Sequence, residues 1–336
     1  MEKKLIIHVG FGKTGTTFLQ QRFFSKQKEI CYIGVPIRHS VYKTVDLFVR
    51  KSDRISLNLA SDKIFKFLET QQEYNTFVIS SENLLDYFGP ECSTGQKEVD
   101  LPSEEKIKRL SLLCKNLHEK HGVHCKVVVT LRNQRAIIRA MYQELYRLGN
   151  LICNERSFYQ KISVDQNYCF GGIFRYSQII ELLMRKFPEE ILVLFYEEMS
   201  SSYGLFMNRL VNFLALKNPR IPKSVKLNAA ETIGDTRQIK YALKFNQTIK
   251  HTDTGLLKSL DDRTKKLPAF FLFSFRLFRK ALRFVEFLPP LRTVFYRKII
   301  FEGPTNQELK KIYNQYYDDN RKLEKLLSVK LKKYGY

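Results

Sequence analysis

The chain has 336 residues and a formal net charge of +23, because 57 lysines and arginines face 34 aspartates and glutamates. A positive field of this size attracts anions, so we expect a nucleotide, an anionic glycan, nucleic acid or an acidic lipid surface as a partner. The six cysteines form no C-x-x-C pair and show no zinc-ligand spacing, so neither a metal site nor a disulfide framework is expected. The length is sufficient for one large α/β core with an appended region.

The first element is an apolar strand over Lys4–Val9, which runs through a glycine-rich turn into a helix over residues 16–25. Glycines at positions 10, 12 and 15 allow a tight turn in which several backbone N–H groups point into one space. The helix brings the positive end of its dipole to the same place. This segment predicts a phosphate-binding loop, with a nucleotide phosphate as its ligand.

The position of the lysine separates this loop from a Walker A loop. Gly10 and Gly15 have the spacing of the motif G-x-x-x-x-G-K-[ST], but Thr16 stands where the lysine belongs. The lysine is instead Lys13, inside the loop, where its ammonium group can reach the bridging side of a terminal diester. Nothing nearby in the sequence supplies the acidic partner that would hold a magnesium ion.

The second strand, Thr76–Ser80, is followed by the polar sequence Ser81-Glu82-Asn83. Because the carboxyl ends of parallel strands meet at one edge of a sheet, we expect Glu82 to face the phosphate loop. Two interpretations of Glu82 remain at this point. It is a general base, or it is a first-turn residue that the helix dipole favours after Ser81 as the cap.

The third strand, Cys125–Leu131, is followed by Arg132. A fixed guanidinium can hold a phosphate through two parallel hydrogen bonds, which a lysine cannot do. The remaining periodic segments predict a strand over Ile191–Phe195 and helices over residues 104–119, 134–148, 175–187 and 202–215.

Strands that alternate with helices indicate an α/β fold in three layers, with a central, mainly parallel sheet flanked by helices. This is the arrangement of P-loop nucleotide-binding folds. We expect residues 1–215 to form the nucleotide-binding core, and residues 216–336 to form a helical C-terminal region packed on that core.

The sequence K-x-G-T-T at residues 13–17 and the strand-end Arg132 resemble the nucleotide-binding motifs of PAPS-dependent sulfotransferases, in particular the bacterial and carbohydrate-sulfating members. The resemblance covers residues 5–215 by motif and order. It implies sulfuryl transfer from PAPS (3′-phosphoadenosine 5′-phosphosulfate) with no required metal. It also implies a 5′-phosphosulfate loop made of Gly12, Lys13, Thr14, Gly15, Thr16 and Thr17.

The same resemblance implies a role for each polar strand end. Arg132 binds the 3′-phosphate of the nucleotide. Lys13 donates a hydrogen bond to the oxygen that bridges phosphate and sulfate, and Glu82 is the base near the end of the second strand. His8 is expected to be a packed strand residue, and His39 is a weaker alternative base.

One position departs from the family pattern. The family has a serine eight residues after the strand-end arginine, whereas this chain has Ala140, which carries no hydroxyl. One donor contact to the 3′-phosphate is therefore in doubt, with Arg135 or Arg139 as a compensating positive charge.

The C-terminal part carries weaker signals. Glu231–Arg237 faintly resembles a G-x-x-G-D segment of cytosolic sulfotransferases, but the basic residues expected before it are missing. Residues 270–288 have a basic amphipathic pattern, which indicates either a membrane-surface helix or a helix whose aromatic side packs on the core. A long closing helix is predicted over residues 307–332.

The sequence thus predicts a sulfotransferase that acts on a hydroxyl or amine of a bacterial surface glycan or glycolipid, without a specific nucleic acid partner. Two alternatives remain: a P-loop kinase of a small alcohol, and a non-catalytic polyanion- or membrane-binding protein. The N-terminus leads directly into the first strand, and no uncharged apolar run approaches the roughly 18 residues of a membrane span. We expect a cytoplasmic protein, peripheral at the inner face of the membrane if residues 270–288 form a surface helix.

Overall fold

The computed structural model describes residues 2–34, 40–51, 55–85, 101–147, 155–165, 174–223 and 304–336. The chain divides into two compact units. One consists of Met1–Met141, Arg156–Leu227 and Pro304–Tyr336 and contains the sheet, and the other consists of Tyr142–Glu155 and Asn228–Gly303. The predictions for His39, residues 231–237 and residues 270–288 lie outside the described residues.

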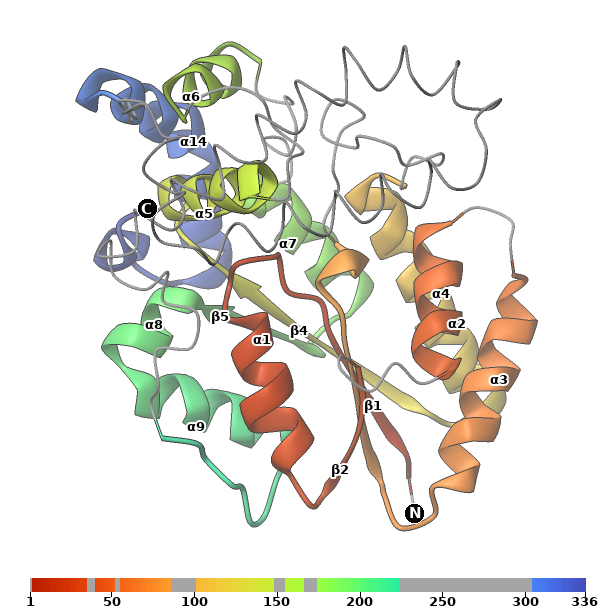
Figure 1. Cartoon of the computed structure of the whole chain (residues 1–336). Helices are drawn as coiled ribbons and strands as arrows, with labels where there is room; N and C mark the ends of the chain where they lie inside the picture. The colour runs from red at the N-terminus through yellow and green to blue at the C-terminus, as the bar shows by residue number, and fades with distance from the viewer. Residues whose placement is uncertain are drawn as a thin grey trace, which may run out of the picture. The chain divides into compact units, whose positions relative to one another are not determined.

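A five-stranded parallel sheet forms the centre of the first unit, in the order β2-β3-β1-β4-β5 (Figure 1). The strands are β1 (Lys4–His8), β2 (Ile30–Gly34), β3 (Thr76–Ser80), β4 (His124–Leu131) and β5 (Ile191–Phe195). All four predicted strands are confirmed, and the α/β fold with them. β2 was not predicted, because its sequence Ile-Cys-Tyr-Ile-Gly is a weaker apolar run than the Ile-Leu-Val-Leu-Phe of β5, the other edge strand.

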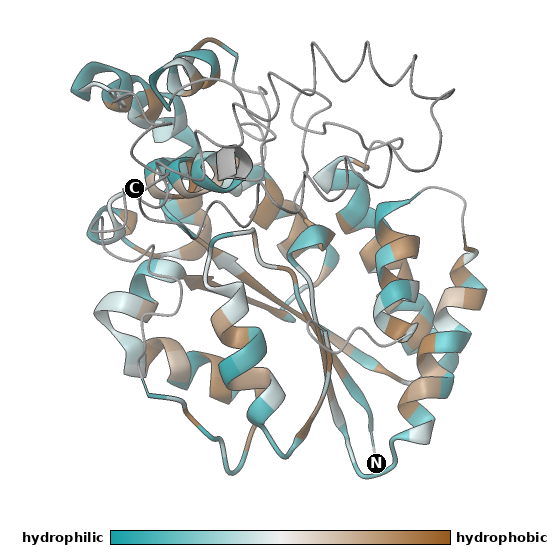
Figure 2. Cartoon of the chain, in the orientation of Figure 1, coloured by the Kyte–Doolittle hydropathy of each residue, from teal (hydrophilic) through white to brown (hydrophobic). Residues whose placement is uncertain are grey.

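Helices cover both faces of the sheet, which is why the strands are nearly continuous apolar runs. On one face, α1 (Thr16–Phe18) continues through η1 (Leu19–Phe23) and η2 (Phe24–Lys26) and packs beside α9 (Tyr203–Leu214). Their side chains meet alternate strand residues in one buried cluster that includes Ile6, Phe18, Phe24, Val78, Val128, Leu194, Phe206 and Leu210. Figure 2 shows the hydrophobic colour concentrated along the central strands and the inner sides of the helices.

The other face is covered by α2 (Ser40–Arg50), α3 (Leu57–Thr70), α4 (Ser103–His121) and α7 (Tyr176–Lys186) (Figure 1). α2 and α3 were not predicted. The sequence of α2 is rich in β-branched and aromatic residues, which favour strands. It is helical because Val41, Val45, Phe48 and Val49 fall on one buried side, so tertiary packing outweighs local propensity.

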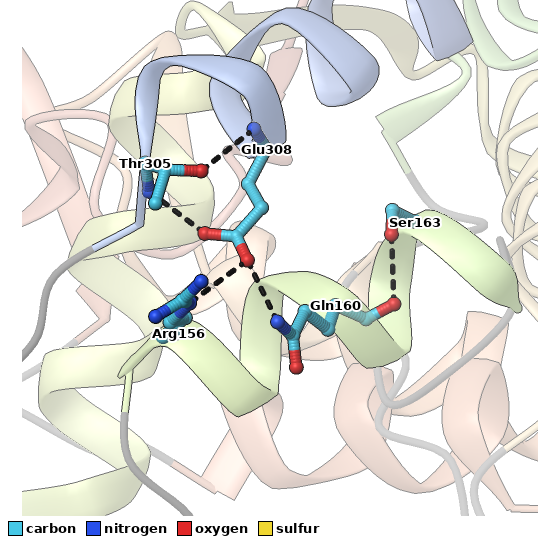
Figure 3. A network of polar contacts seen from close by, with 5 residues as sticks. All are labelled: Arg156, Gln160, Ser163, Thr305 and Glu308. Carbon is cyan, nitrogen blue, oxygen red and sulfur yellow. Dashed lines mark hydrogen bonds and ion pairs between the residues drawn. The ribbon is translucent and has the colours of Figure 1, made fainter.

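The chain returns to the first unit at α14 (Asn306–Leu327), the predicted closing helix, which ends at Leu327 and packs on α7. Thr305 and Glu308 form a reciprocal capping box at its start. The Glu308 carboxylate also accepts hydrogen bonds from Arg156 and Gln160 of α6 (Glu155–Val164), at 3.1 and 2.7 Å (Figure 3). The backbone N–H of Thr305 is the main reason why the pKa of Glu308 falls to about 2. These bonds fix the start of α14 on α6.

The helices predicted at residues 16–25, 104–119, 134–148, 175–187 and 202–215 are confirmed within a few residues. β5, the fourth predicted strand, leads into α8 (Tyr196–Ser201), a helix that was not predicted. β4 leads into α5 (Gln134–Arg147), which is the helix predicted at residues 134–148. Within the part of the chain that is described, no helix combines the length and the apolar character needed to cross a membrane.

Candidate active site

The loop after β1 is held in a compact, partly strained conformation. Lys13 has φ +66° and Gly15 has φ +87°, both in the left-handed region. That region costs a non-glycine residue about 1–2 kcal/mol, so the surrounding contacts must hold Lys13 there. A Cβ atom on Gly10 would lie 2.5 Å from Cγ2 of Thr16, so a larger residue cannot replace this glycine without moving the loop. The loop after β1 is therefore a tight turn, as its glycines predicted.

The threonines of the loop have different surroundings. Thr14 is fully buried, and its hydroxyl donates to the carbonyl oxygen of Phe11 at 2.6 Å, so this side chain stabilises the loop itself. Thr16 and Thr17 begin the helix after the loop. The first turn of any helix has backbone N–H groups without an intrahelical acceptor, which suits an anion at this position.

Glu82 lies against this loop. It begins η3 (Glu82–Leu84), directly after β3, and its Oε2 accepts a hydrogen bond of 2.8 Å from the hydroxyl of Thr16. The structure therefore brings the end of β3 and the loop after β1 together. A carboxylate at this position can accept a proton from a hydroxyl or amine that enters beside the loop.

Arg132 follows β4 and is also fixed against the loop. Its Nη1 donates to the carbonyl oxygen of Lys13 at 2.8 Å, and its guanidinium carbon lies 4.4 Å from the centre of the Tyr196 ring. The Tyr176 hydroxyl donates to the Arg132 carbonyl at 2.8 Å. The Nε atom of Arg132 is buried without a hydrogen-bond partner among the described residues. A guanidinium fixed in this way loses little entropy when it binds an anion.

His8 lies beneath the loop and is fully buried, as predicted. Its two ring nitrogens lie 2.7 Å from the Ser80 hydroxyl and 3.3 Å from the Thr130 hydroxyl, so it connects β1 to both neighbouring strands. Gln20 donates to the same Ser80 hydroxyl at 3.1 Å. Burial lowers the pKa of His8 to about 3, so the ring is neutral. It supports the loop and does not face solvent as a base would.

Some residues of this site were missed from the sequence, where a strand was predicted over Ile191–Phe195 but no functional role was given to the residues that follow it. Tyr196 and Glu197 follow β5, and Tyr176 begins α7. The signal that would have found them is their position, because Tyr196 and Glu197 are polar residues directly after a buried strand of the same sheet. Arg135 and Arg139, the proposed substitutes for a contact at Ala140, are both exposed on α5.

These residues fit a nucleotide with two anionic ends. The loop offers backbone donors next to Lys13, and the buried Nε of Arg132 shows that the guanidinium has remaining donor capacity. Among the described residues, no group of three or more histidine, cysteine, aspartate or glutamate side chains is arranged to hold a metal ion.

A profile of the sulfotransferase domain matches residues 3–265 of the chain. No curated protein is significantly similar to it in sequence. Among solved structures, a sulfotransferase from Alicyclobacillus acidocaldarius is similar with 15% identity and a TM-score of 0.45, over 72% of this chain and 91% of that one. Mouse sulfotransferase SULT7A1 complexed with PAP is similar with 15% identity and a TM-score of 0.35, over 74% of this chain and 67% of that one. Because the profile covers more than half of its length, the chain belongs to the sulfotransferase domain family, whose enzymes use PAPS, and it is a PAPS-dependent sulfotransferase.

Proposed function

We propose that this enzyme transfers the sulfuryl group of PAPS to a hydroxyl or amine of a bacterial surface glycan or glycolipid. The observation that carries the site assignment is the hydrogen bond from Arg132 to the Lys13 carbonyl, which joins the loop after β1 to the end of β4. The residues assigned to nucleotide binding are Gly12, Lys13, Thr14, Gly15, Thr16, Thr17 and Arg132, and those assigned to catalysis are Lys13 and Glu82.

In this proposal the two anionic ends of the nucleotide are bound by different elements. Backbone N–H groups of the loop and of the first helical turn bind the 5′-phosphate. Arg132 binds the 3′-phosphate through two parallel hydrogen bonds, and its existing bond to Lys13 O keeps the two phosphate sites at a fixed separation.

PAPS supplies an activated sulfuryl group when it is bound. Lys13 donates a hydrogen bond to the oxygen between phosphate and sulfur, and so stabilises the negative charge that develops there as the sulfur–oxygen bond breaks. An ammonium group held in advance is effective because it needs no reorganisation during the reaction. The strained φ of Lys13 is consistent with this role, because strain of this kind is retained where geometry serves function.

Glu82 takes the proton of the acceptor hydroxyl or amine. In the structure, the Thr16 hydroxyl donates its one proton to Glu82. The same proton cannot also be donated to a phosphate oxygen. We therefore propose that phosphate binding at Thr16 releases the Glu82 carboxylate, which becomes ready to accept a proton after the donor is in place.

The acceptor class is supported by charge and by exposed aromatic side chains. The chain carries a net charge of +23, and Tyr313 and Tyr317 are exposed on α14 with ring centres 6.0 Å apart. The Arg321 guanidinium lies 5.9 Å from the Tyr317 ring. Aromatic rings beside cations suit a sugar that bears anionic groups. We further propose a cytoplasmic enzyme that contacts the inner face of the membrane through residues 270–288.

Calorimetry tests the donor assignment. We expect adenosine 3′,5′-bisphosphate (PAP), the desulfated product, to bind the wild-type enzyme, and ATP with magnesium not to bind. Binding of ATP with magnesium and not of PAP would overturn the assignment of the loop and of Arg132. An acceptor screen with labelled PAPS then compares anionic with neutral glycans, and equal transfer to both would overturn the proposed acceptor class.

A further inference from the structure

The last residues of the described chain lie against the ends of β4 and β5. The segment Leu331–Tyr336 includes a short helical turn, η7 (Leu331–Tyr334), and its residues Tyr334 and Tyr336 are buried. The Tyr334 ring stacks on Phe195 with ring centres 4.8 Å apart, and the Tyr336 ring lies 6.0 Å from the same phenylalanine. We call residues 331–336 the tail.

Hydrogen bonds attach the tail to both strand ends. The side-chain amide of Asn133 donates to the Gly335 carbonyl, and the Tyr334 hydroxyl donates to the carboxylate of Glu198. The Oδ1 atom of Asn133 also accepts from two backbone N–H groups at the start of α5, at 3.1 and 3.3 Å. Asn133 directly follows Arg132, so one side chain connects the tail, the helix and the strand end that carries the arginine.

Arg132 Nε, Glu197 Oε2 and the Tyr336 hydroxyl are buried without hydrogen-bond partners among the described residues. The Tyr336 ring lies 6.0 Å from Phe195, two residues before Glu197, and 6.3 Å from the Tyr176 ring, whose hydroxyl donates to the Arg132 carbonyl. Burial and then the Glu197 charge raise the pKa of Tyr336, and burial raises the pKa of Glu197 while Arg132 opposes that rise. Buried polar atoms without partners are rare in native proteins, so a cluster of such atoms calls for an explanation.

The charges of this cluster suggest the explanation. The other oxygen of Glu197 accepts from the Asn133 backbone N–H at 2.8 Å, which keeps the carboxylate beside Arg132. A carboxylate there competes with a phosphate for the same guanidinium. A hydroxyl that donates to Glu197 Oε2 through one bridging water molecule satisfies that oxygen and leaves the guanidinium to the phosphate.

We propose that the tail tunes the nucleotide site, with Tyr336 as a positioning residue that keeps the Glu197 carboxylate from competing with the nucleotide 3′-phosphate for Arg132. This inference rests on the proposed binding of the 3′-phosphate by Arg132. It adds a specificity element that no contiguous sequence motif contains, since the tail and Arg132 lie at distant positions of the chain.

The test compares two nucleotides that differ in the 3′-phosphate. Calorimetry measures the dissociation constants of PAP and of adenosine 5′-monophosphate for each variant. Tyr336→Phe keeps the buried ring. We expect it to raise the dissociation constant of PAP about tenfold and that of the monophosphate less than about twofold. Glu197→Gln added to Tyr336→Phe removes the competing charge and keeps the acceptor for Asn133, so it should restore PAP affinity.

A second variant removes a hydrogen bond that holds the tail and leaves Tyr336 unchanged. Asn133→Ser loses the amide that donates to Gly335 but keeps an oxygen that can cap α5. We expect this variant also to weaken the binding of PAP more than the binding of the monophosphate. Tyr74→Phe, which removes a hydroxyl just before β3 and so at the opposite edge of the sheet, is the matched control and should change neither constant.

The outcomes separate this inference from the function on which it rests. If Arg132→Ala abolishes the preference for PAP but Tyr336→Phe and Asn133→Ser keep it, the role of the tail is wrong and the donor site stands. Equal weakening of both nucleotides by Tyr336→Phe would show a purely structural role and would also overturn the inference. If the wild-type enzyme does not prefer PAP to the monophosphate, the Arg132 assignment fails, and the inference fails with it.

Discussion

The two sides of the carboxyl edge of the sheet are built differently. On the loop side, which comprises residues 10–17 and 80–84, one contiguous turn carries Lys13 and the proposed phosphate donors, and the Glu82 carboxylate contacts it. On the tail side, which comprises residues 131–133, 195–198 and 331–336, separate segments surround one arginine. The proposed phosphate loop is therefore encoded in one contiguous segment, which Glu82 reaches from β3, while the surroundings of the proposed second anchor, Arg132, come from several distant segments.

The largest expected effect is on the loop side. Lys13→Ala should lower kcat about 10³-fold, because it removes a donor held ready for the charge that develops in the transition state. PAP affinity should fall less than about tenfold, since the backbone donors remain. Steady-state kinetics and calorimetry measure the two effects. Lys63→Ala, on the exposed side of α3, is the matched control. Unchanged turnover of Lys13→Ala would refute its catalytic role.

The next effect decides between the two interpretations of Glu82. Glu82→Gln keeps an oxygen that can accept from Thr16, so the loop should stay folded and PAP should still bind. A lost general base should lower kcat about 10²-fold. A mere first-turn residue would leave kcat intact and cost only a few tenths of a kcal/mol of stability. Kinetics and thermal unfolding of the same sample distinguish these results.

A smaller effect concerns His8, which joins the two sides beneath the loop. Its pKa is lowered by burial from 6.5 to about 3, so between these values the unfolded chain binds a proton that the folded chain does not. Stability attributable to this group is complete above pH 6.5 and is lost as the pH falls toward 3. From pH 6.5 to pH 5 the loss should be about 2 kcal/mol.

Denaturant unfolding at several pH values measures this slope in the wild type and in His8→Asn, where the slope should be shallower over the same range. The exposed His118, changed to Asn, is the control and should leave the slope unchanged. Equal slopes for wild type and His8→Asn would contradict the neutral, buried state of the ring.

The smallest effect compares strain that serves function with strain that does not. Lys13 and Ala215 both have left-handed backbone conformations, with φ +66° and +53°, and Ala215 is the C-cap of α9. Glycine at either position should raise the free energy of unfolding by about 0.5–1 kcal/mol. Ala215→Gly should keep full turnover, whereas Lys13→Gly should lose it. Equal turnover in both variants would contradict the catalytic role of the Lys13 ammonium group.

Much of the fold could be predicted because a parallel sheet with both faces covered produces apolar runs that stand out in the sequence. β1, β3, β4 and β5 were recognised in this way. β2 and α2 were not, since the apolar run of β2 is weaker than that of β5 and since Val41, Val45 and Phe48 favour a strand until a core is present to bury them. Glu82 was predicted to face the loop from its position after β3, and the structure places it there. Tyr196 and Glu197 follow β5 in the same way but were not singled out from the sequence.

The sequence by itself was enough to predict the tight turn after β1 and to propose its phosphate-binding role. Glycines, Lys13 and the threonines are contiguous there, and a turn of such residues needs no distant partner to point its N–H groups into one space. The surroundings of Arg132 were decided by the tertiary structure alone. Tyr176, Tyr196 and Gly335 reach the end of β4 only when the sheet and the last helix have packed, because burial and not local spacing holds them there.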